Sequence, residues 1–407
     1  MIGFVQSLIT VVLFVLVLGA LVIIHEIGHF ASARLARVRV LEFGIGFPPR
    51  ARVLRNQGET LYTLNWLPIG GFVKLEGEDG ADAAVQAPTA EVSTEVAGVS
   101  VSVPISSGFG TSGGVAYGDA ATDPRSFAAQ RYITKMLILV AGVGMNVLLA
   151  FAIFTGIAWL ASPYVGLRFH EVQPGSPAAV AGLQPGEAIT AIDGQRYQFI
   201  TGPNALTGLR ERAGQTVQLT LADGQGHERV VPVTLRLPEE INAQQGALGI
   251  SGATTPFEAY FYGQYAQNDL PTAIQVGADQ TVRWMGLIVG GLGALVSSVA
   301  NDPTAPPPVS GPVGIATQIG DIFWNSGPIM LLYVAGILSA NLAVVNILPF
   351  PPLDGGRMLM ITLKRFLGAR MTVQAEQLTY MVGFVFLFVF LIWITGFDII
   401  RGLGGGS

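Results

Sequence analysis

Four long apolar runs constrain this chain more than any other feature of its sequence. They cover about residues 4–30, 136–163, 327–348 and 379–397, and each is close to the roughly 20 residues that a helix needs to cross a hydrocarbon core. Charged residues make up only 12% of the 407 residues, against about 25% in soluble domains. The sequence therefore predicts a polytopic α-helical membrane protein with about four transmembrane helices.

Basic residues gather in the connections that follow the first and the third run. The first connection carries Arg34, Arg37, Arg39, Arg50, Arg52, Arg55, Arg131 and Lys135, and the last carries Arg357, Lys364, Arg365 and Arg370. Because cytoplasmic loops are enriched in lysine and arginine, we expect both connections in the cytoplasm, and both chain ends with residues 164–326 on the opposite side. A glycine-rich stretch at 285–300 is shorter than a span, and a crossing there would place the last basic cluster outside. We predict that this stretch lies at the membrane surface or packs on the helix bundle.

Two regions between the runs differ from the rest in composition. Residues 78–126 hold few large apolar side chains, which predicts a low-complexity cytoplasmic insertion. Residues 166–236 contain alternating runs such as "TVQLTL" between glycine-containing turns, which predicts a folded domain with strands. The expected order is 1–77 with the first transmembrane helix and a β region, 78–126 as the insertion, 127–165 as the second transmembrane helix, 166–236 as the folded domain, 237–326 as an amphipathic or surface helical region, and 327–407 as the last two transmembrane helices.

The composition excludes some classes of chemistry. The chain has no cysteine, so disulfides and thiolate metal ligands are excluded. Its net charge of −5 is thinly spread and gives no basic footprint for nucleic acid.

The first apolar run ends in the motif "HEIGHF". Residues four apart on a helix project from one face, so His25 and His29 can supply two imidazole ligands to one zinc ion. Glu26 is then placed to accept a proton from water activated by the metal. Polar residues that merely mark a helix end are the alternative, but ionisable groups in an apolar helix are costly and usually functional.

A third ligand candidate follows the third apolar run in "ANLAVVNILPFPPLDGGR". Asp354 lies on the same predicted side of the membrane as the end of the first run, and the prolines before it break the helix. The alternative interpretation of Asp354 is a structural turn at a helix end, which the following glycines favour. Together with the two histidines, the metal-ligand interpretation is preferred. Asn341 and Asn346 supply amides that can hold an extended peptide.

Several motifs in one order give the sequence a family resemblance. They are "HEIGHF" (25–30), "EFGIGF" (42–47), "LNWLPIGGFVKLEGE" (64–78), "AGVGMN" (141–146), "VQPGSPAAVAGLQPGEAITAIDG" (172–194), "SGPVGIA" (310–316) and "NILPFPPLDGGR" (346–357). On these motifs the sequence resembles the site-2 protease family of intramembrane zinc metalloproteases, in the RseP/RasP-like branch of RIP metalloproteases. The resemblance covers nearly the whole chain apart from 78–126.

The resemblance implies roles for particular residues. It implies that His25, His29 and Asp354 bind Zn²⁺, that Glu26 is the catalytic base, and that Asn346 positions the substrate. It further implies that "LNWLPIGGFVKL" forms a membrane-associated β-hairpin or loop. The alternating apolar residues around Gly70 and Gly71 agree with that, and an exposed edge there can pair with an extended substrate. The alternative is a loop that plugs the helix bundle.

The resemblance also implies an inserted PDZ-like (α+β) domain at 166–236. Two roles are open for this domain, gripping a new C-terminus or limiting the access of substrates with large outer domains, and we favour the second. "GLRF" at 166–169 lies where PDZ domains keep a carboxylate-binding loop. The chain has room for one PDZ domain where relatives carry two. It has "GVGMN" in place of the family's usual Gly-Pro before the asparagine, which leaves the role of Asn146 open.

The function implied is regulated intramembrane proteolysis in a bacterial cytoplasmic (inner) membrane. The expected partners are the lipid bilayer and a single-pass transmembrane substrate, such as a pre-trimmed anti-sigma factor or a remnant signal peptide, cut near the cytoplasmic face. A catalytically inactive PDZ-containing scaffold is the first alternative, and the intact set of His25, Glu26, His29 and Asp354 argues against it. A metal transporter is the second, but paired repeats with several intramembrane acids are not found.

Overall fold

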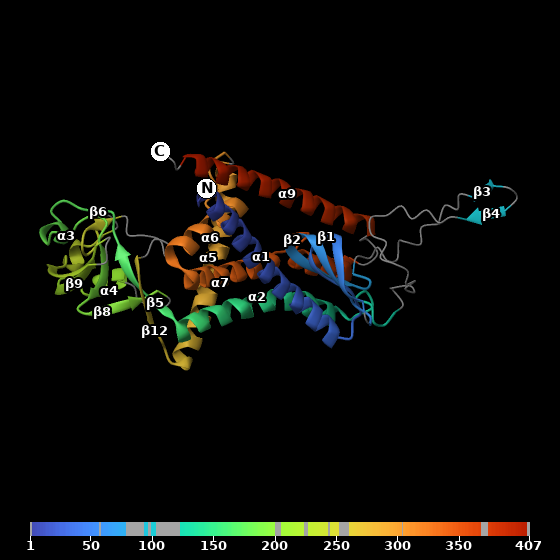
Figure 1. The fold of residues 1–407 in the computed structure, drawn as a ribbon, viewed down its shortest axis with the longest axis horizontal. Coiled ribbons are helices and arrows are strands. Elements are labelled where there is room, and N and C mark those ends of the chain that lie inside the picture. The colour runs from blue at the N-terminus through green and yellow to red at the C-terminus, as the bar shows by residue number, and fades with distance from the viewer. Residues whose placement is uncertain are drawn as a thin grey trace. The chain divides into compact units, whose positions relative to one another are not determined.

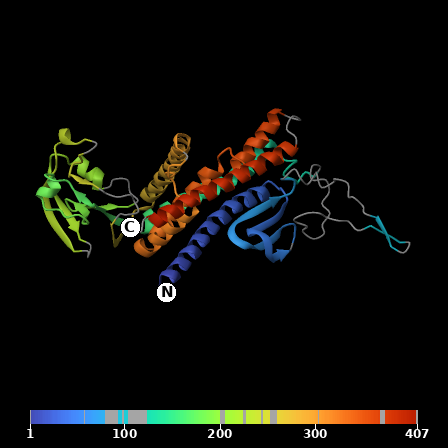
Figure 2. The same ribbon diagram turned by 90° about the horizontal axis from the view of Figure 1, so that it is seen from above.

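We describe a computed structural model of the chain, drawn in Figures 1 and 2. The residues described are 2–56, 58–78, 93–96, 99–102, 123–199, 205–223, 227–242, 245–251, 260–302, 304–367 and 373–404. Most of the predicted insertion at 78–126 lies outside them, and within it a short hairpin is described, β3 (Ser93–Val96) with β4 (Val99–Ser102).

The described chain divides into two compact units, and each is treated by itself. The first comprises Met1–Val11, Val147–Val309 and Val313–Asn341, and the second comprises Val12–Asn146, Ser310–Pro312 and Leu342–Ser407. Three long helices contribute residues to both units: α1 (Ile2–Leu35), α2 (Tyr132–Leu160) and α7 (Pro328–Asn346).

Five of the described helices are long and apolar enough to cross a membrane, judged by length and composition. They are α1, α2, α5 (Leu270–Asn301), α7 and α9 (Val373–Gly404). Four of them coincide with the apolar runs of the sequence. The multi-pass membrane character is therefore confirmed, whereas the predicted count of four crossings stays a prediction.

Helix α5 differs from its sequence prediction in length. The stretch at 285–300 is the second half of a 32-residue helix that begins at Leu270, so the expectation that it is too short for a span was wrong. The helix starts early because the Asp269 side chain accepts a hydrogen bond from the Thr272 backbone N–H, and Pro271 lies in the first turn. Both features favour a helix start.

A polar contact fixes α5 within its own unit. Trp284 Nε1 donates to the Tyr333 hydroxyl of α7 at 2.8 Å, and that hydroxyl donates to Gln280 Oε1 at 3.0 Å. A Cβ added at Gly277 would lie 2.0 Å from Thr155 Oγ1 of α2. Small residues and interhelical hydrogen bonds are typical of helices packed within membranes.

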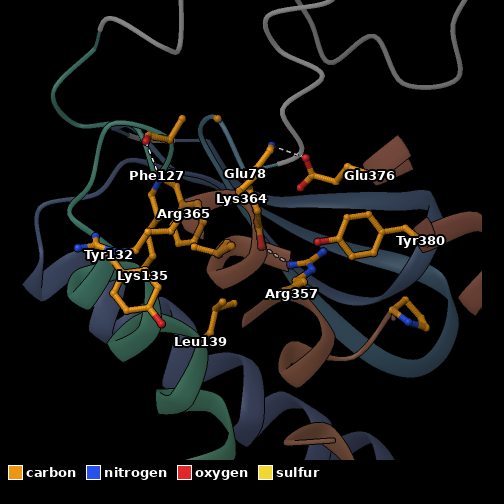
Figure 3. Close-up of a pocket in the computed structure, with 14 residues that line it drawn as sticks. Glu78, Phe127, Tyr132, Lys135, Leu139, Arg357, Lys364, Arg365, Glu376 and Tyr380 are labelled. Atoms are coloured by element: carbon orange, nitrogen blue, oxygen red, sulfur yellow. Dashed lines mark hydrogen bonds and ion pairs between the residues drawn. The ribbon is translucent and has the colours of Figure 1, made fainter. Parts of the chain in front are cut away.

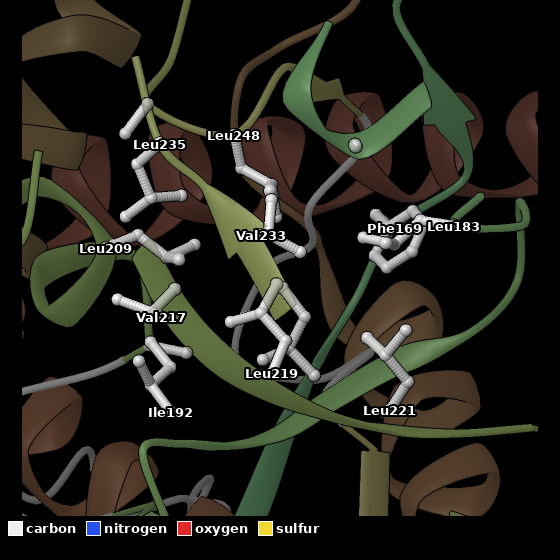
Figure 4. Close-up of a cluster of buried hydrophobic side chains, with 14 of the residues drawn as sticks. Phe169, Leu183, Ile192, Leu209, Val217, Leu219, Leu221, Val233, Leu235 and Leu248 are labelled. Atoms are coloured by element: carbon white, nitrogen blue, oxygen red, sulfur yellow. The ribbon is translucent and has the colours of Figure 1, made fainter. Parts of the chain in front are cut away.

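The first unit also contains a six-stranded sheet of order β10-β9-β7-β8-β5-β12. Its strands are β5 (Ser162–Arg168), β7 (Ala188–Ile192), β8 (Gln195–Gln198), β9 (Thr216–Ala222), β10 (Glu228–Thr234) and β12 (Tyr260–Ala266), and the short elements around it are β6 (Glu171–Val172), α3 (Pro177–Val180), α4 (Ala205–Glu211), the 3-10 helix η2 (Pro238–Glu240) and β11 (Ile250–Ser251). Alternation in β9 turns Val217, Leu219 and Leu221 into the core, which Figure 4 shows between the strands.

The core of this domain extends beyond residue 236, where the sequence prediction ends it. Leu248 is buried in the same cluster as Phe169, and β11 pairs with β6. The "GLRF" residues 166–169 do not form a loop here. Gly166 lies opposite Tyr260 of β12, and Leu167 lies opposite Ile189 of β7, so "GLRF" belongs mostly to strand β5.

In the second unit, two long strands lie beside the C-terminal half of α1 (Figures 1 and 2). They are β1 (Val40–Asn56) and β2 (Leu61–Leu75). The segment expected as a β-hairpin or loop, 64–75, lies within β2, and the register shows the chain reversing inside it. As β1 runs from Glu42 to Ile45, its partners rise from Leu61 to Leu64 along one edge and fall from Lys74 to Gly71 along the other. Gly70 has φ +91°, which glycine tolerates where a strand bends.

The same two strands pair along more than one stretch. In the register, Ile45 lies opposite Gly71 and also opposite Leu64, so the first part of β1 has a neighbour along each edge. Large apolar side chains are exposed near the bend, including Trp66 at 71% and Leu67 at 53%. Exposed aromatic residues of this kind suit a membrane interface.

Two shorter helices of the described chain lie on either side of α7 in the sequence. Helix α6 (Pro312–Ser326) precedes α7, and α8 (Asp354–Leu367) follows it after a proline-rich turn. Gly311 N–H donates to Asp398 Oδ1 of α9 at 3.1 Å, which satisfies a backbone donor just before α6.

Candidate metal centre

Helix α1 carries the "HEIGH" residues without interruption, so the predicted helical spacing is present. The side chains of His25 and His29 are buried, with 5% and 8% of their residue surface exposed. Their rings meet edge to face with centroids 4.7 Å apart. Both imidazoles therefore point to the same side of α1.

Asp354 meets these histidines from far away in the sequence. It is the first residue of α8, so the helix-boundary alternative also describes its backbone. Its Oδ2 lies 2.9 Å from His25 Nε2 and 3.3 Å from His29 Nε2, and the two Nε2 atoms are 3.1 Å apart.

This donor set fits a zinc ion. Ligand atoms about 2.0–2.1 Å from a tetrahedral zinc lie roughly 3.3 Å from one another. The three separations in this cluster range from 2.9 to 3.3 Å. Two imidazoles and one carboxylate also form a known catalytic zinc set that leaves a position for water.

Helix α2 supports the two histidines through a stripe of residues spaced four apart: Ile138, Gly142 and Asn146. His29 Nδ1 donates to the Ile138 carbonyl at 2.9 Å, which leaves its Nε2 available as a ligand. The Asn146 amide lies 3.2 Å from His25 Nδ1 and is buried. Each ring is thus oriented through the nitrogen that faces away from the cluster.

Two glycines allow α1 and α2 to approach this closely. A Cβ added at Gly28 would lie 2.4 Å from the Ala141 carbonyl oxygen, and one at Gly142 would lie 2.3 Å from His29 Nε2. Neither position has room for a methyl group. The histidines therefore occupy space that a glycine leaves on α2.

A cavity of about 400 Å³ opens beside the cluster. Glu26, Gly70, Gly71 and Asn346 line it together with the three candidate ligands and Asn146. A Cβ at Gly71 would lie 3.5 Å from Glu26 Cγ, so strand β2 passes directly over the glutamate. Asn341, which was also predicted to bind substrate, is not among the described residues that line this cavity.

Sequence reasoning left the role of Asn146 open and did not identify Ile138 and Gly142 as its companions on α2. The spacing of Ile138, Gly142 and Asn146 was available as a signal, because residues four apart share a helix face. A glycine within an apolar helix is common, however, and nothing local marks this one as facing a histidine.

Comparison with known proteins relates the sequence of this chain to proteases. The model of the family described as "Peptidase family M50" matches residues 13–390. The zinc metalloprotease RasP of Geobacillus kaustophilus is 29% identical, with 97% of this chain and 99% of the relative covered. The zinc metalloprotease RasP of Bacillus licheniformis is 28% identical, with 96% and 99% covered.

Proposed function

Because the chain belongs to peptidase family M50, we propose that it hydrolyses a peptide bond within or near the transmembrane helix of a single-pass membrane protein. The family makes it a zinc metalloprotease of the site-2 type, and its bacterial relatives and apolar helices make it a multi-pass bacterial membrane protein. The substrate and the position of the cut are the proposal.

One observation carries the assignment of the site. His25, His29 and Asp354 are the only described His, Cys, Asp or Glu residues that cluster closely enough to hold a metal ion, with all their ligand atoms within 4.8 Å. These three residues would hold the zinc. When bound, zinc acts as a Lewis acid that polarises the peptide carbonyl and acidifies water.

Glu26 is the proposed general base, which transfers a proton from water to the leaving group. Its side chain lines the cavity next to the three ligands, where a carboxylate can take a proton from the attacking water and deliver it to the departing nitrogen. The Asn146 amide and the Ile138 carbonyl keep the imidazoles in place during the reaction.

Strand β2 offers a binding edge to the substrate. Within the described residues, 71–75 have register partners along one edge only, from Val40 to Ile45, while Gly70 and Gly71 line the cavity. A substrate segment that unwinds can add to this edge by strand pairing. The Asn346 amide, which also lines the cavity, would hold its backbone.

The membrane arrangement and the extracytoplasmic domain complete the proposal. We propose four crossings with the site near the cytoplasmic face of the inner membrane, and the basic connections support this orientation. The PDZ-like domain limits access in this proposal, which is supported by the "GLRF" stretch lying mostly in strand β5 rather than in a carboxylate-binding loop. Suitable substrates are membrane-tethered regulators already trimmed outside, or remnant signal peptides.

Replacing the proposed base tests this function. Glu26→Gln should retain zinc, because no proposed ligand is lost, but should abolish cleavage of a single-span substrate, because the amide cannot accept the proton. Zinc content and cleavage are measured on the same reconstituted sample. Cleavage by the variant at a rate near wild type would remove Glu26 from the mechanism, and an inactive but zinc-loaded wild type would favour the scaffold alternative.

A further inference from the structure

A second cavity of about 680 Å³ lies beside the candidate metal centre. It is drawn in Figure 3, between the start of α2, the helix α8 and the start of α9. The side chains that matter here are Tyr132, Lys135, Arg357, Lys364, Arg365 and Tyr380. The proposed proteolysis makes no use of it.

The wall of this cavity has an excess of positive charge. Arg357 forms an ion pair with Glu78, and Lys364 forms one with Glu376. Lys135 and Arg365 are two further cations, so four cations face two carboxylates.

Neither of the two further cations has a carboxylate partner within the described part of the chain. Lys135 Nζ donates to the Ala128 carbonyl at 2.7 Å and lies 5.7 Å from the Phe127 ring centroid. The Arg365 guanidinium lies 5.0 Å from the Tyr132 ring centroid. Their charge is thus available to an anion that enters the cavity.

The cavity lies at the level where two candidate spans end. Tyr132 is the first residue of the span in α2, and Tyr380 lies near the start of the span Leu378–Arg401 in α9. Tyrosine is enriched at the boundary between lipid and water. Ile133 and Leu137, at the same end of α2, are 69% and 63% exposed, so an apolar surface for acyl chains adjoins the cations.

We propose that this cavity binds the phosphate headgroup of an anionic phospholipid, with Lys135 and Arg365 as its principal contacts. Basic pockets between transmembrane helices are suited to such headgroups. A lipid is favoured over an acidic peptide because the cations and both tyrosines lie at helix ends beside exposed apolar side chains. Arg357 lines this cavity and that of the metal centre, so a bound lipid would also hold the helix that begins with Asp354.

The test measures lipid binding, which does not depend on proteolysis. Purified full-length protein is titrated with phosphatidylglycerol and, separately, with phosphatidylcholine, and bound lipid is counted by native mass spectrometry. Wild type should bind about one phosphatidylglycerol per chain and should bind phosphatidylcholine more weakly. The double variant Lys135→Gln and Arg365→Gln should bind it about thirty-fold more weakly, given the attraction expected for each basic residue near a membrane surface.

Two controls separate the site from general charge and from misfolding. Arg52→Gln with Arg55→Gln removes the same charge from exposed positions of β1. This variant should still bind phosphatidylglycerol more tightly than phosphatidylcholine. Lys135→Arg with Arg365→Lys keeps both charges and should retain most of the phosphatidylglycerol binding that the double glutamine variant loses.

Four outcomes would overturn the proposal. They are equal binding of both lipids by wild type, equal losses in the two glutamine variants, displacement of the lipid by millimolar inorganic phosphate, and displacement by a soluble acidic peptide at stoichiometric concentration. The third result would assign the cavity to free phosphate, and the fourth to a peptide.

Discussion

Gly142→Ala should damage the metal centre although no proposed ligand is changed. The added Cβ would lie 2.3 Å from His29 Nε2 and 2.9 Å from His25 Cε1, where an ordinary contact begins at 3.4 Å. The His29 ring, or α2 itself, must therefore retreat by about 1.1 Å, the difference between 3.4 and 2.3 Å. Metal–ligand distances tolerate only about 0.2 Å.

The expected loss of zinc affinity in Gly142→Ala follows from two opposing effects. Alanine is favoured over glycine in a helix by about 1 kcal/mol, which alone would stabilise α2. Displacing His29 removes one of three protein ligands and stretches its bond to the Ile138 carbonyl. Disturbing an outer contact alone costs about 10–100-fold in metal affinity, so we expect zinc binding at least 100-fold weaker, or about 2.7 kcal/mol.

The matched control lies two residues further along the same helix. A Cβ at Gly144 meets no described atom within 4 Å, so Gly144→Ala makes the same chemical change without the steric clash. Zinc per chain is measured after equilibration with graded concentrations of a chelator, and monodisperse elution in detergent checks folding. Wild-type zinc affinity in a folded Gly142→Ala variant would refute the packing described for this site.

Three further predictions follow from the proposed function. His25→Ala and Asp354→Ala should each lower zinc content and activity, whereas His170→Ala, at an exposed position, should change neither; elemental analysis would contradict the ligand set if all three variants kept zinc. Cysteines introduced by Ala129→Cys and Val180→Cys, both at exposed positions, should react with an impermeant reagent from opposite sides of the membrane, and reaction from one side would overturn the topology. Deleting 162–251, the whole described core of the domain rather than 166–236, should allow cleavage of untrimmed substrates. If trimmed substrates then remain uncut and untrimmed ones are still refused, the domain grips or supports rather than filters.

The sequence predicted the parts of the site that periodicity can reveal. His25 and His29 share a helix face because of their spacing, and Asp354 follows a helix that the basic residues orient. The approach of α1 to α2 was not predictable, because Gly28 and Gly142 resemble any other glycines in apolar helices. Their role depends on which helix lies opposite, and that is a tertiary property.

In the fold as well, features set by local sequence were predictable, and features set by residues distant in the sequence were not. Four apolar runs predicted four of the long helices, because composition over about 20 residues is a local signal. The start of α5 was missed because its first half mixes polar residues with apolar ones, and its boundary depends on the Asp269 cap. The pairing of Ile45 with both Gly71 and Leu64 joins segments whose own alternation cannot specify their partners.

The meeting of His29 with Asp354 also limits how the chain can be threaded through the bilayer. Two points on the same side must be separated by an even number of complete passages. Between these residues lie α2 and α7, which supply two, and α5, which would make the number odd; α6, at 15 residues, is shorter than the roughly 20 that a passage needs. We therefore infer that α5, although apolar enough to cross, does not pass completely through the bilayer.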